Sequence, residues 1–300
     1  MNILVIRHGA LGDFVMSFAP FAAIRAHHPR AQITLMTTAP FVDLAQSAPW
    51  FDRVIVDAKP AWWDIAAVLR LRTQLTGFDF VYDLQTSGRS SRYFWLARRA
   101  GWSGVAAGCS HPQRGPLRET MHTIERQRDQ LRLAGIADFP APDLRFLTDR
   151  PGPAIEPPYA LLVPGAAPHR PEKRWPAARY GALACILRDR GLHPVVIGAP
   201  ADSALGAEIS AICPAATDLI GRTTLPDLFP LAARAAVAIG NDTGPMHIAA
   251  ATGCRCVVLF SAASDPALTA PRGPDGAWPT VLRAPVLADL TLERVAAAVA

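Results

Sequence analysis

The stretch AVAIGNDTGPMHIAAATGCRCVVLF, residues 236–260, indicates the fold class. A short apolar strand signal ends in the polar loop NDTG, a helix is predicted over Pro245 to Thr252, and the β-branched run CVVLF follows. Strands that alternate with helices form parallel sheets, because the path between two parallel strands is long enough to hold a helix. We therefore expect a parallel α/β domain around this stretch.

The same alternation extends in both directions along the chain. Strand signals in the first half are NILVIR, QITLMTT, RVIVD and DFVYDL, and in the second half YALLV and PVVIG. Helices are expected over residues 13–28, 41–48, 62–75, 90–100, 177–190 and 203–212, from Leu225, and over 292–300. Six prolines within nineteen residues indicate a linker: Pro140, Pro142, Pro151, Pro153, Pro157 and Pro158. We predict two doubly wound, Rossmann-like parallel-sheet domains, residues 1–150 and 151–300, whose strand ends face each other across a cleft.

Composition excludes several classes of protein. With 50% hydrophobic and 18% charged residues, the 300-residue chain is neither disordered nor fibrous. Its five cysteines are scattered and include no C-x-x-C pair, which favours a reducing compartment. No apolar run approaches the ~20 residues of a membrane helix. We expect a cytoplasmic protein that can contact a membrane surface without spanning it.

The positive charge belongs to the first half of the chain. Residues 1–150 hold 18 Lys and Arg against 13 Asp and Glu, whereas residues 151–300 hold 12 against 12. Nine arginines lie between residues 84 and 132, at positions 89, 92, 98, 99, 114, 118, 126, 128 and 132. Such a face attracts phosphates, anionic lipid or nucleic acid, or is simply a solvated helix face. No nucleic-acid-binding motif is present, so we do not expect nucleic acid as a partner.

The loop HGALGD, residues 8–13, follows the first strand. Gly9 and Gly12 permit tight turns, and Asp13 stands near the start of a helix. The loop is not the G-x-G-x-x-G dinucleotide fingerprint, and no Walker motif occurs in the chain. A carboxylate at this position serves either as a helix cap or as a group that faces a ligand.

The loop VPGAAPHRPEKRWP, residues 163–176, contains an unusual lysine. The chain has 28 arginines but only two lysines, Lys59 and Lys173. A compact ammonium beside a ligand site suits a diphosphate, and the alternative is an ordinary solvated lysine.

The motif GNDTGPMHIAAATG, residues 240–253, combines features of an anion site. Its loop ends at a helix N-terminus, where backbone amides attract phosphate, and His247 lies one turn inside the helix. The alternative is that Asp242 or Thr243 only caps the helix. No D-x-D or H-E-x-x-H motif occurs, so no metal site is predicted and no cofactor is expected to be required, although Mg²⁺ remains open.

The chain resembles the ADP-heptose:lipopolysaccharide heptosyltransferases of glycosyltransferase family 9. The resemblance rests on RHGALGD, on DLQTSGRSSRYFWLARRAG from Asp83, on PHRPEKRWP from Pro168, and above all on GNDTGPMHIAAATG. It implies a GT-B fold, in which the first domain binds the acceptor and the second binds the nucleotide-sugar. The sequence departs from the family at Ala166 and Ala167, where relatives offer a hydroxyl, and at Ser261, Ala262 and Ala263.

The resemblance also implies roles for individual residues. Asp13 matches the general base, and Lys173 matches the lysine at the donor diphosphate. The other donor contacts would be Asp242, Thr243, Gly244, His247, Asp202 at the ribose, and Arg222 and Thr223 at the adenine. Within the basic first half we assign acceptor contacts to Lys59, Gln85, Arg89 and Arg92.

These residues support a metal-independent, inverting transfer of heptose, or a similar sugar, from an ADP-sugar to a phosphorylated glycolipid of the lipopolysaccharide core. Asp13 would take the acceptor proton while Lys173 stabilises the departing diphosphate. The acceptor would be held at the inner membrane leaflet. Two alternatives stay open at this point: a sugar-nucleotide epimerase or hydrolase of the same fold, and a non-catalytic nucleotide-binding protein.

Overall fold

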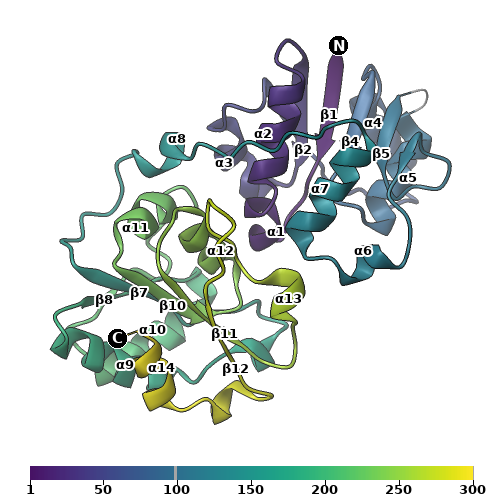
Figure 1. The fold of residues 1–300 in the computed structure, drawn as a ribbon. Coiled ribbons are helices and arrows are strands. Elements are labelled where there is room, and N and C mark those ends of the chain that lie inside the picture. Colours follow the sequence, from purple (N-terminus) through teal and green to yellow (C-terminus); the bar gives the residue numbers. More distant parts are fainter. Residues whose placement is uncertain (98–99, 300) are drawn as a thin grey trace. The chain divides into compact units, whose positions relative to one another are not determined.

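A computed structural model describes residues 1–97 and 100–299, in two compact units, Met1–Pro142 and Asp143–Ala300 (Figure 1). Arg98 and Arg99 of the basic segment, and Ala300 of the expected closing helix, lie outside the described residues. The units divide eight residues before the expected boundary at residue 150. The reason is α8 (Arg145–Thr148), which packs against α11 (Leu228–Arg234) of the second unit.

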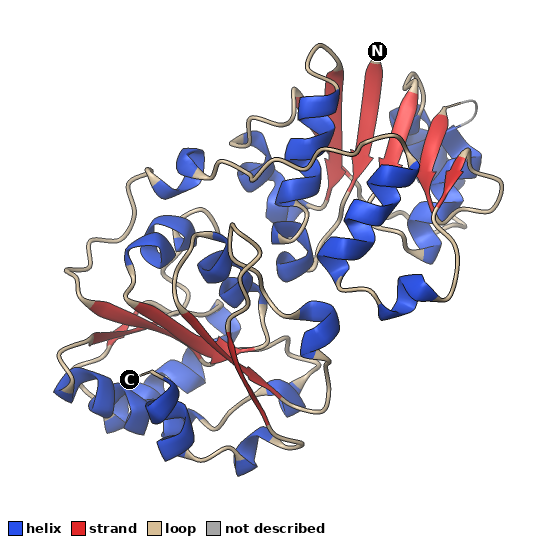
Figure 2. Ribbon diagram, in the orientation of Figure 1, coloured by secondary structure: helices blue, strands red, loops and turns tan. Residues whose placement is uncertain are grey.

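The first unit contains the predicted doubly wound parallel sheet, with strand order β3-β2-β1-β4-β5-β6 (Figure 2). All neighbouring strands are parallel, and the register pairs Val5 with Leu35 on one side and with Tyr82 on the other. The strands are β1 (Asn2–Ile6), β2 (Gln32–Thr37), β3 (Arg53–Val56), β4 (Phe80–Asp83), β5 (Gly101–Gly104) and β6 (His111–Pro112). The order reverses between β1 and β4, and this switch point is where such sheets bind ligands.

Helices cover both faces of this sheet. Leu71 and Leu75 of α4 (Ile65–Leu75) and Tyr93 and Ala97 of α5 (Gly88–Ala97) join the core on one face, and α2 (Phe18–His27) and α7 (Thr123–Leu133) lie on the other (Figure 1). The remaining elements are α1 (Leu11–Val15), η1 (Ala39–Phe41), α3 (Val42–Gln46) and α6 (Leu117–Thr120).

The prediction of one helix over residues 13–28 is wrong, because α1 and α2 are separate helices. Pro20 has no N–H to donate to the carbonyl of Met16, so the helical hydrogen-bond ladder cannot run through this turn. The second helix instead begins with the Phe21 N–H bonded to Ser17 O at 2.8 Å.

The second unit repeats the architecture, with strand order β12-β11-β10-β7-β8-β9 and all neighbours parallel. Its strands are β7 (Tyr159–Val163), β8 (His193–Val196), β9 (Thr217–Asp218), β10 (Val237–Asn241), β11 (Cys256–Phe260) and β12 (Thr280–Arg283). Its further helices are η2 (Pro171–Lys173), α9 (Ala177–Asp189), η3 (Pro200–Asp202), α10 (Ser203–Ile212), α12 (Gly244–Ala251), α13 (Pro266–Thr269), η4 (Leu287–Asp289) and α14 (Leu292–Ala298). The order reverses between β7 and β10.

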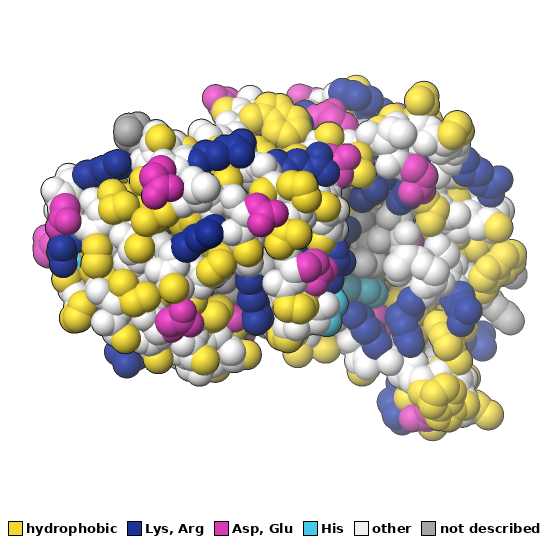
Figure 3. All heavy atoms as spheres, turned by 90° about the horizontal axis from the view of Figure 1, so that it is seen from below, with side chains coloured by type: hydrophobic (Ala, Val, Ile, Leu, Met, Phe, Trp, Pro, Cys, Tyr) yellow, Lys and Arg dark blue, Asp and Glu magenta, His cyan; other side chains and the backbone are white. Residues whose placement is uncertain are grey.

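Burial of the strands fits a sheet that is covered on both faces. Every residue of β7, β10 and β11 is buried, as expected for central parallel strands. Helices α9, α10 and α14 supply the core on one face of this sheet, and α11 and α12 pack together over the other (Figure 1). Within residues 1–97 and 100–299, no helix has the length and apolarity needed to cross a bilayer. In the view of Figure 3, hydrophobic side chains reach the surface between Lys and Arg side chains.

Candidate functional site

In the second unit, the loops after β7 and β10 meet at the switch point. Lys173 Nζ donates to Asp242 Oδ2 at 2.6 Å, and the Ser264 hydroxyl donates to the same oxygen at 2.7 Å. The Lys173 and Asp242 side chains are only 17% and 7% exposed. Lys173 is therefore not a solvated loop lysine.

The N-terminus of α12 lies next to this pair. Thr243 stands at the N-cap position in an extended conformation, and in the described structure no side chain caps the helix. The carboxylate of Asp242 is occupied by Lys173 and Ser264. The capping alternative thus does not describe either residue. The positive end of the helix dipole favours an anion at this position. His247 lies one turn inside, 5% exposed.

Asn241, which the sequence reasoning missed, fixes the two loops relative to each other. Its Nδ2 donates to Pro164 O at 2.7 Å, and its Oδ1 accepts from the Trp175 N–H at 3.0 Å and from the Tyr180 hydroxyl at 3.1 Å. Asn241 is fully buried, so these bonds are made in a nonpolar surrounding where they hold the loops firmly. The sequence could have indicated Asn241, because it ends the strand and directly precedes Asp242.

The residues expected at the ribose and the adenine follow β8 and β9. Asp202, 8% exposed, lies against Gly165 and Gly198, where an added Cβ would meet its carboxylate at 2.5 and 3.2 Å. Arg222 and Thr223 come after β9, the edge strand next to β8, and Arg222 is exposed. The expected donor residues therefore occur at the carboxyl ends of four neighbouring strands, β10, β7, β8 and β9.

The positions where the sequence departs from the family lie in the same region. Ala166 is buried, and its carbonyl accepts from Arg174 Nη2 at 3.1 Å. The Ala263 carbonyl accepts from Arg170 Nη2 at 2.7 Å, and the next residue is Ser264, which contacts Asp242. The altered segment is thus tied to the loop that carries Lys173.

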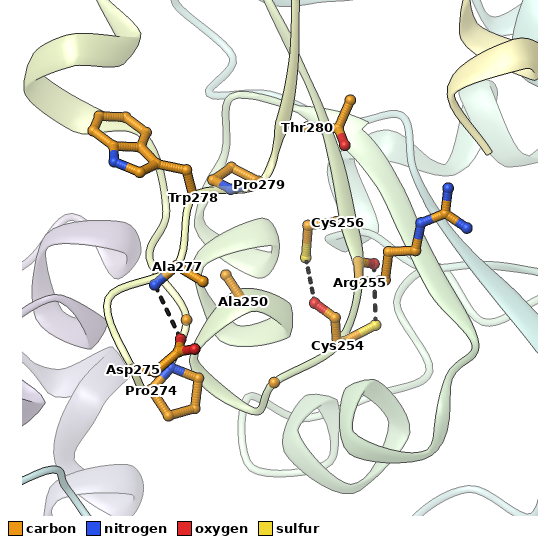
Figure 4. Close-up of a pocket in the computed structure, with 12 residues that line it drawn as sticks. Ala250, Cys254, Arg255, Cys256, Pro274, Asp275, Ala277, Trp278, Pro279 and Thr280 are labelled. Carbon is orange, nitrogen blue, oxygen red and sulfur yellow. Dashed lines mark hydrogen bonds between the residues drawn. The ribbon is translucent and has the colours of Figure 1, made fainter. Parts of the chain in front are cut away.

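A separate pocket of about 450 Å³ lies at the opposite edge of this sheet. Cys256 and Thr280, the first residues of β11 and β12, line it together with Cys254 and Trp278 (Figure 4). None of the residues expected to bind the donor lines this pocket.

In the first unit, Arg7 and Asp13 meet at the switch point. Arg7 follows β1, and its guanidinium donates to Leu84 O at 2.6 Å and to Asp13 O at 2.8 Å. Its Nη2 also lies 3.4 Å from Asp13 Oδ1. In the described structure no side chain caps α1, and the Asp13 side chain is 41% exposed. Asp13 is thus held by Arg7 and open to a ligand, rather than used as a cap.

A buried hydrogen-bonded group supports this loop. His8 Nε2 lies 3.0 Å from Asp57 Oδ2, and the Tyr93 hydroxyl donates to the same oxygen at 2.6 Å. Burial by itself raises the pKa of Asp57, but the hydrogen bonds from His8, Tyr93 and the Lys59 N–H outweigh it and lower the pKa. Gly9 has φ +105°, and a Cβ there would lie 2.3 Å from the Phe41 ring, so the loop requires glycine.

Three of the four expected acceptor residues lie at the loop before α4. Arg89 Nη1 donates to Pro60 O at 3.1 Å, and the guanidinium carbons of Arg89 and Arg92 lie 5.0 and 5.4 Å from the centre of the Trp62 ring. Lys59 is exposed, with its backbone N–H bonded to Asp57. Gln85 lies apart from them, where its Oε1 accepts from the His8 N–H at 2.9 Å.

Arg126, one of the nine arginines of the basic segment, lies within electrostatic range of both Asp13 and Arg118. Arg118 donates to the Thr86 hydroxyl at 2.7 Å, just beyond β4. Burial lowers the pKa of Arg126, the nearby charge of Arg118 lowers it further, and the charge of Asp13 raises it. Burial lowers the pKa of the Arg7 guanidinium, the charge of Asp13 opposes this, and the charge of Arg126 lowers the pKa further, so Arg7 belongs to the same positive field.

Within the described ranges, no three His, Cys, Asp or Glu side chains are grouped so that they could hold a metal ion.

The family description of glycosyltransferase family 9 (heptosyltransferase) matches residues 68–278. The chain belongs to this family. It is 28% identical over 292 residues to lipopolysaccharide heptosyltransferase 2 of Escherichia coli (strain K12), covering 88% of this chain and 84% of that protein.

Solved structures of the family share the fold. The E. coli ADP-heptose LPS heptosyltransferase II matches with a TM-score of 0.77 and 25% identity, over 99% of this chain and 97% of that one. The E. coli heptosyltransferase WaaC, solved with ADP, matches with a TM-score of 0.79 over 98% of each chain at 20% identity. The GT-B fold that the resemblance implied is confirmed, and the chain is a glycosyltransferase of this family.

Proposed function

We propose that this protein transfers a heptose from ADP-heptose to a phosphorylated acceptor of the lipopolysaccharide core, with inversion at the anomeric carbon. Support for the donor and the acceptor comes from the E. coli relatives, which are named for ADP-heptose and for lipopolysaccharide. The family match favours a transferase over an epimerase or a non-catalytic binding protein.

The observation that carries the proposal is the Lys173–Asp242 pair beside the open N-terminus of α12. An ammonium has three N–H donors, so Lys173 can keep its bond to Asp242 and still bind a diphosphate. The amides of Thr243 and Gly244 add the positive end of the helix dipole. Together they stabilise the charge that builds up on the leaving ADP.

The order of the strands suggests how the rest of the donor lies. With the diphosphate at β7 and β10, the sugar would sit by Asp242 and His247. The ribose would lie towards Asp202 after β8, and the adenine towards Arg222 and Thr223 after β9. The sites thus follow the sheet edge in the same order as the chemical groups of ADP-heptose.

Asp13 is the proposed general base. The acceptor hydroxyl oxygen forms a bond to the anomeric carbon, the bond from that carbon to the diphosphate oxygen breaks, and Asp13 accepts the hydroxyl proton. Arg7 positions the residue through its contacts with the main chain and the carboxylate of Asp13. Proton removal by such a group is worth typically 10²- to 10⁴-fold in rate.

Anionic groups of the acceptor would bind the arginines of the first unit. Arg126 is the strongest candidate, because it lies within electrostatic range of Asp13, and Arg118 lies within electrostatic range of Arg126. The exposed cations Lys59 and Arg92 and the partly buried Arg89 provide a second group, around Trp62.

A transfer assay with a matched set of controls tests the function. The purified protein is incubated with ADP-heptose and a phosphorylated lipopolysaccharide-core acceptor, and ADP release and the mass of the glycan are measured. We expect ADP release only when the acceptor is present, with the mass gain of one heptose. Turnover of ADP-heptose without acceptor would indicate a hydrolase or epimerase, and tight ADP binding without turnover would indicate a binding protein. Either result would overturn the proposal.

A further inference from the structure

Helix α4 carries a second apolar stripe on its solvent side. Its inner face is buried through Leu71 and Leu75, which are 2% and 0% exposed. On its outer side Ile65 and Leu69, one turn apart, are 71% and 53% exposed, and Trp63 just before the helix is 86% exposed. A surface helix of a globular protein needs one apolar stripe for its core, so packing within the fold does not account for the second.

Helix α5 extends this surface. It packs beside α4 on the same face of the sheet, and its Trp95 is 66% exposed. We call the outer side of the two helices the apolar-basic surface. It consists of Trp63, Ile65, Leu69 and Trp95 together with Arg70 and Arg72.

The charge of the apolar-basic surface has one sign. Helices α4 and α5 contain four arginines and no acidic residue. The acidic residue next to them is Asp64, whose carboxylate accepts from the Ala67 N–H at 2.9 Å and so caps α4. A surface hollow of about 350 Å³, lined by Leu69, Arg72, Thr73 and Thr76, places an apolar and a cationic side chain side by side.

We propose that the apolar-basic surface docks the enzyme on an anionic lipid bilayer. Tryptophan and aliphatic side chains favour the boundary between headgroups and acyl chains, and arginines bind the phosphates of the headgroups. A bilayer with negative headgroups satisfies both kinds of side chain at once, and a neutral or positively charged protein surface does not. The inference extends the proposed function, since a lipid-borne acceptor would be reached from the membrane surface.

Vesicle sedimentation without donor or acceptor tests the docking directly. The full chain is mixed with vesicles of phosphatidylglycerol and phosphatidylcholine, or of phosphatidylcholine alone, and the bound fraction is measured. We expect binding to the anionic vesicles that weakens roughly tenfold for Trp63→Ser and for Leu69→Ser, through lost apolar burial. Arg70→Gln and Arg72→Gln should each weaken it about fivefold. Leu133→Ser, at a leucine 51% exposed elsewhere in the first unit, and Arg30→Gln are the matched controls and should bind like the unaltered protein.

The outcomes separate docking from catalysis. Equal binding by the surface variants and the controls, or no binding of the unaltered protein to anionic vesicles, would overturn the docking proposal. So would self-association in analytical ultracentrifugation that Trp63→Ser abolishes, because the surface would then bind a second copy. Transfer to a water-soluble, delipidated acceptor is measured in parallel. If it persists while vesicle binding fails, only the docking is wrong; if it fails while vesicle binding holds, only the proposed function is wrong.

Discussion

Lys173 and Asp242 form an ion pair at 2.6 Å between loops 69 residues apart in the sequence. The pair fixes the ammonium at the N-terminus of α12 before any ligand arrives, and the Ser264 hydroxyl completes the bonding of the carboxylate. A preorganised cation of this kind costs no reorganisation when charge develops on the leaving group. The pair therefore serves both the stability of the site and the proposed chemistry.

These two roles can be separated by mutation. Lys173→Met leaves the Asp242 carboxylate nearly buried without its cation, so we expect the free energy of unfolding to fall by about 3 kcal/mol. Adding Asp242→Asn removes the unpaired charge and should restore most of this stability. ADP affinity should fall roughly 10- to 100-fold in both variants, since the diphosphate loses a charged donor.

Calorimetric titration with ADP and urea unfolding measure the two effects. Lys59→Met, at the other lysine of the chain, is the control for ADP affinity. If the double variant regained both stability and ADP affinity, Lys173 would be a purely structural residue.

Asp13 should affect the chemical step and leave donor binding unchanged. Asp13→Asn keeps the size of the side chain but cannot take up the acceptor proton, so kcat should fall by roughly 10²- to 10⁴-fold. The Kd for ADP should change less than twofold. Steady-state transfer kinetics and calorimetry provide both numbers, with Asp43→Asn, an exposed carboxylate in α3, as control. Near-normal kcat in Asp13→Asn would rule out this residue as the base.

Local patterns were enough to predict most of the fold. Strand runs such as YALLV and CVVLF are buried on both faces, and their alternation with helices fixes the parallel sheet. The sequence reasoning missed short or polar elements such as β6, which has two residues, and β5, which reads GWSG. Their place in the sheet comes from pairing, of β5 with β4 and of β6 with β5, rather than from β propensity.

The candidate site was predicted where one motif holds several of its residues, and missed where the residues come from distant segments. Asp242 and Thr243 are adjacent in the sequence, so their proximity could be predicted without knowledge of the fold. Ser264 and Arg118 reach the site through contacts that span 22 and 32 residues, which no local pattern shows. Arg7 belongs to the motif RHGALGD. Its hydrogen bond to Leu84 O could not be predicted from that motif, because it depends on the pairing of β1 with β4.

Arg126 and its neighbour Arg118 should control acceptor binding. Arg118→Gln and Arg126→Gln should each raise the KM for the phosphorylated acceptor roughly tenfold, because each removes a charged hydrogen-bond donor. The KM of the unaltered protein should rise with salt, and the variants should show a smaller rise. Arg128→Gln, on helix α7 together with Arg126 and paired with Glu125, is the matched control. Unchanged acceptor KM in both variants would place the acceptor elsewhere.

Asp83, at the end of β4, should make stability depend on pH. Its side chain is completely buried, and burial raises its pKa to about 6, although hydrogen bonds from Thr86, Ser90 and Gln85 oppose the shift. The folded state thus holds this proton more tightly than the unfolded chain, whose carboxyl has its ordinary pKa of 3.8. The free energy of unfolding therefore falls as pH rises from about 4 to about 6, by about 3 kcal/mol in total, and this contribution is constant above that range.

Asp83→Asn isolates this contribution, because the amide does not ionise. In the unaltered protein the Thr86 N–H donates to Asp83 Oδ1 at 3.0 Å, and the amide oxygen of the variant can accept the same hydrogen bond. We expect the variant to be more stable than the unaltered protein at pH 7, with the difference shrinking towards pH 4. Urea unfolding at a series of pH values measures the difference, and Asp43→Asn should show no such trend. A difference that stays constant between pH 4 and pH 7 would mean that Asp83 is already ionised in the folded protein, with its charge balanced by Arg7, whose positive charge lowers the pKa of Asp83.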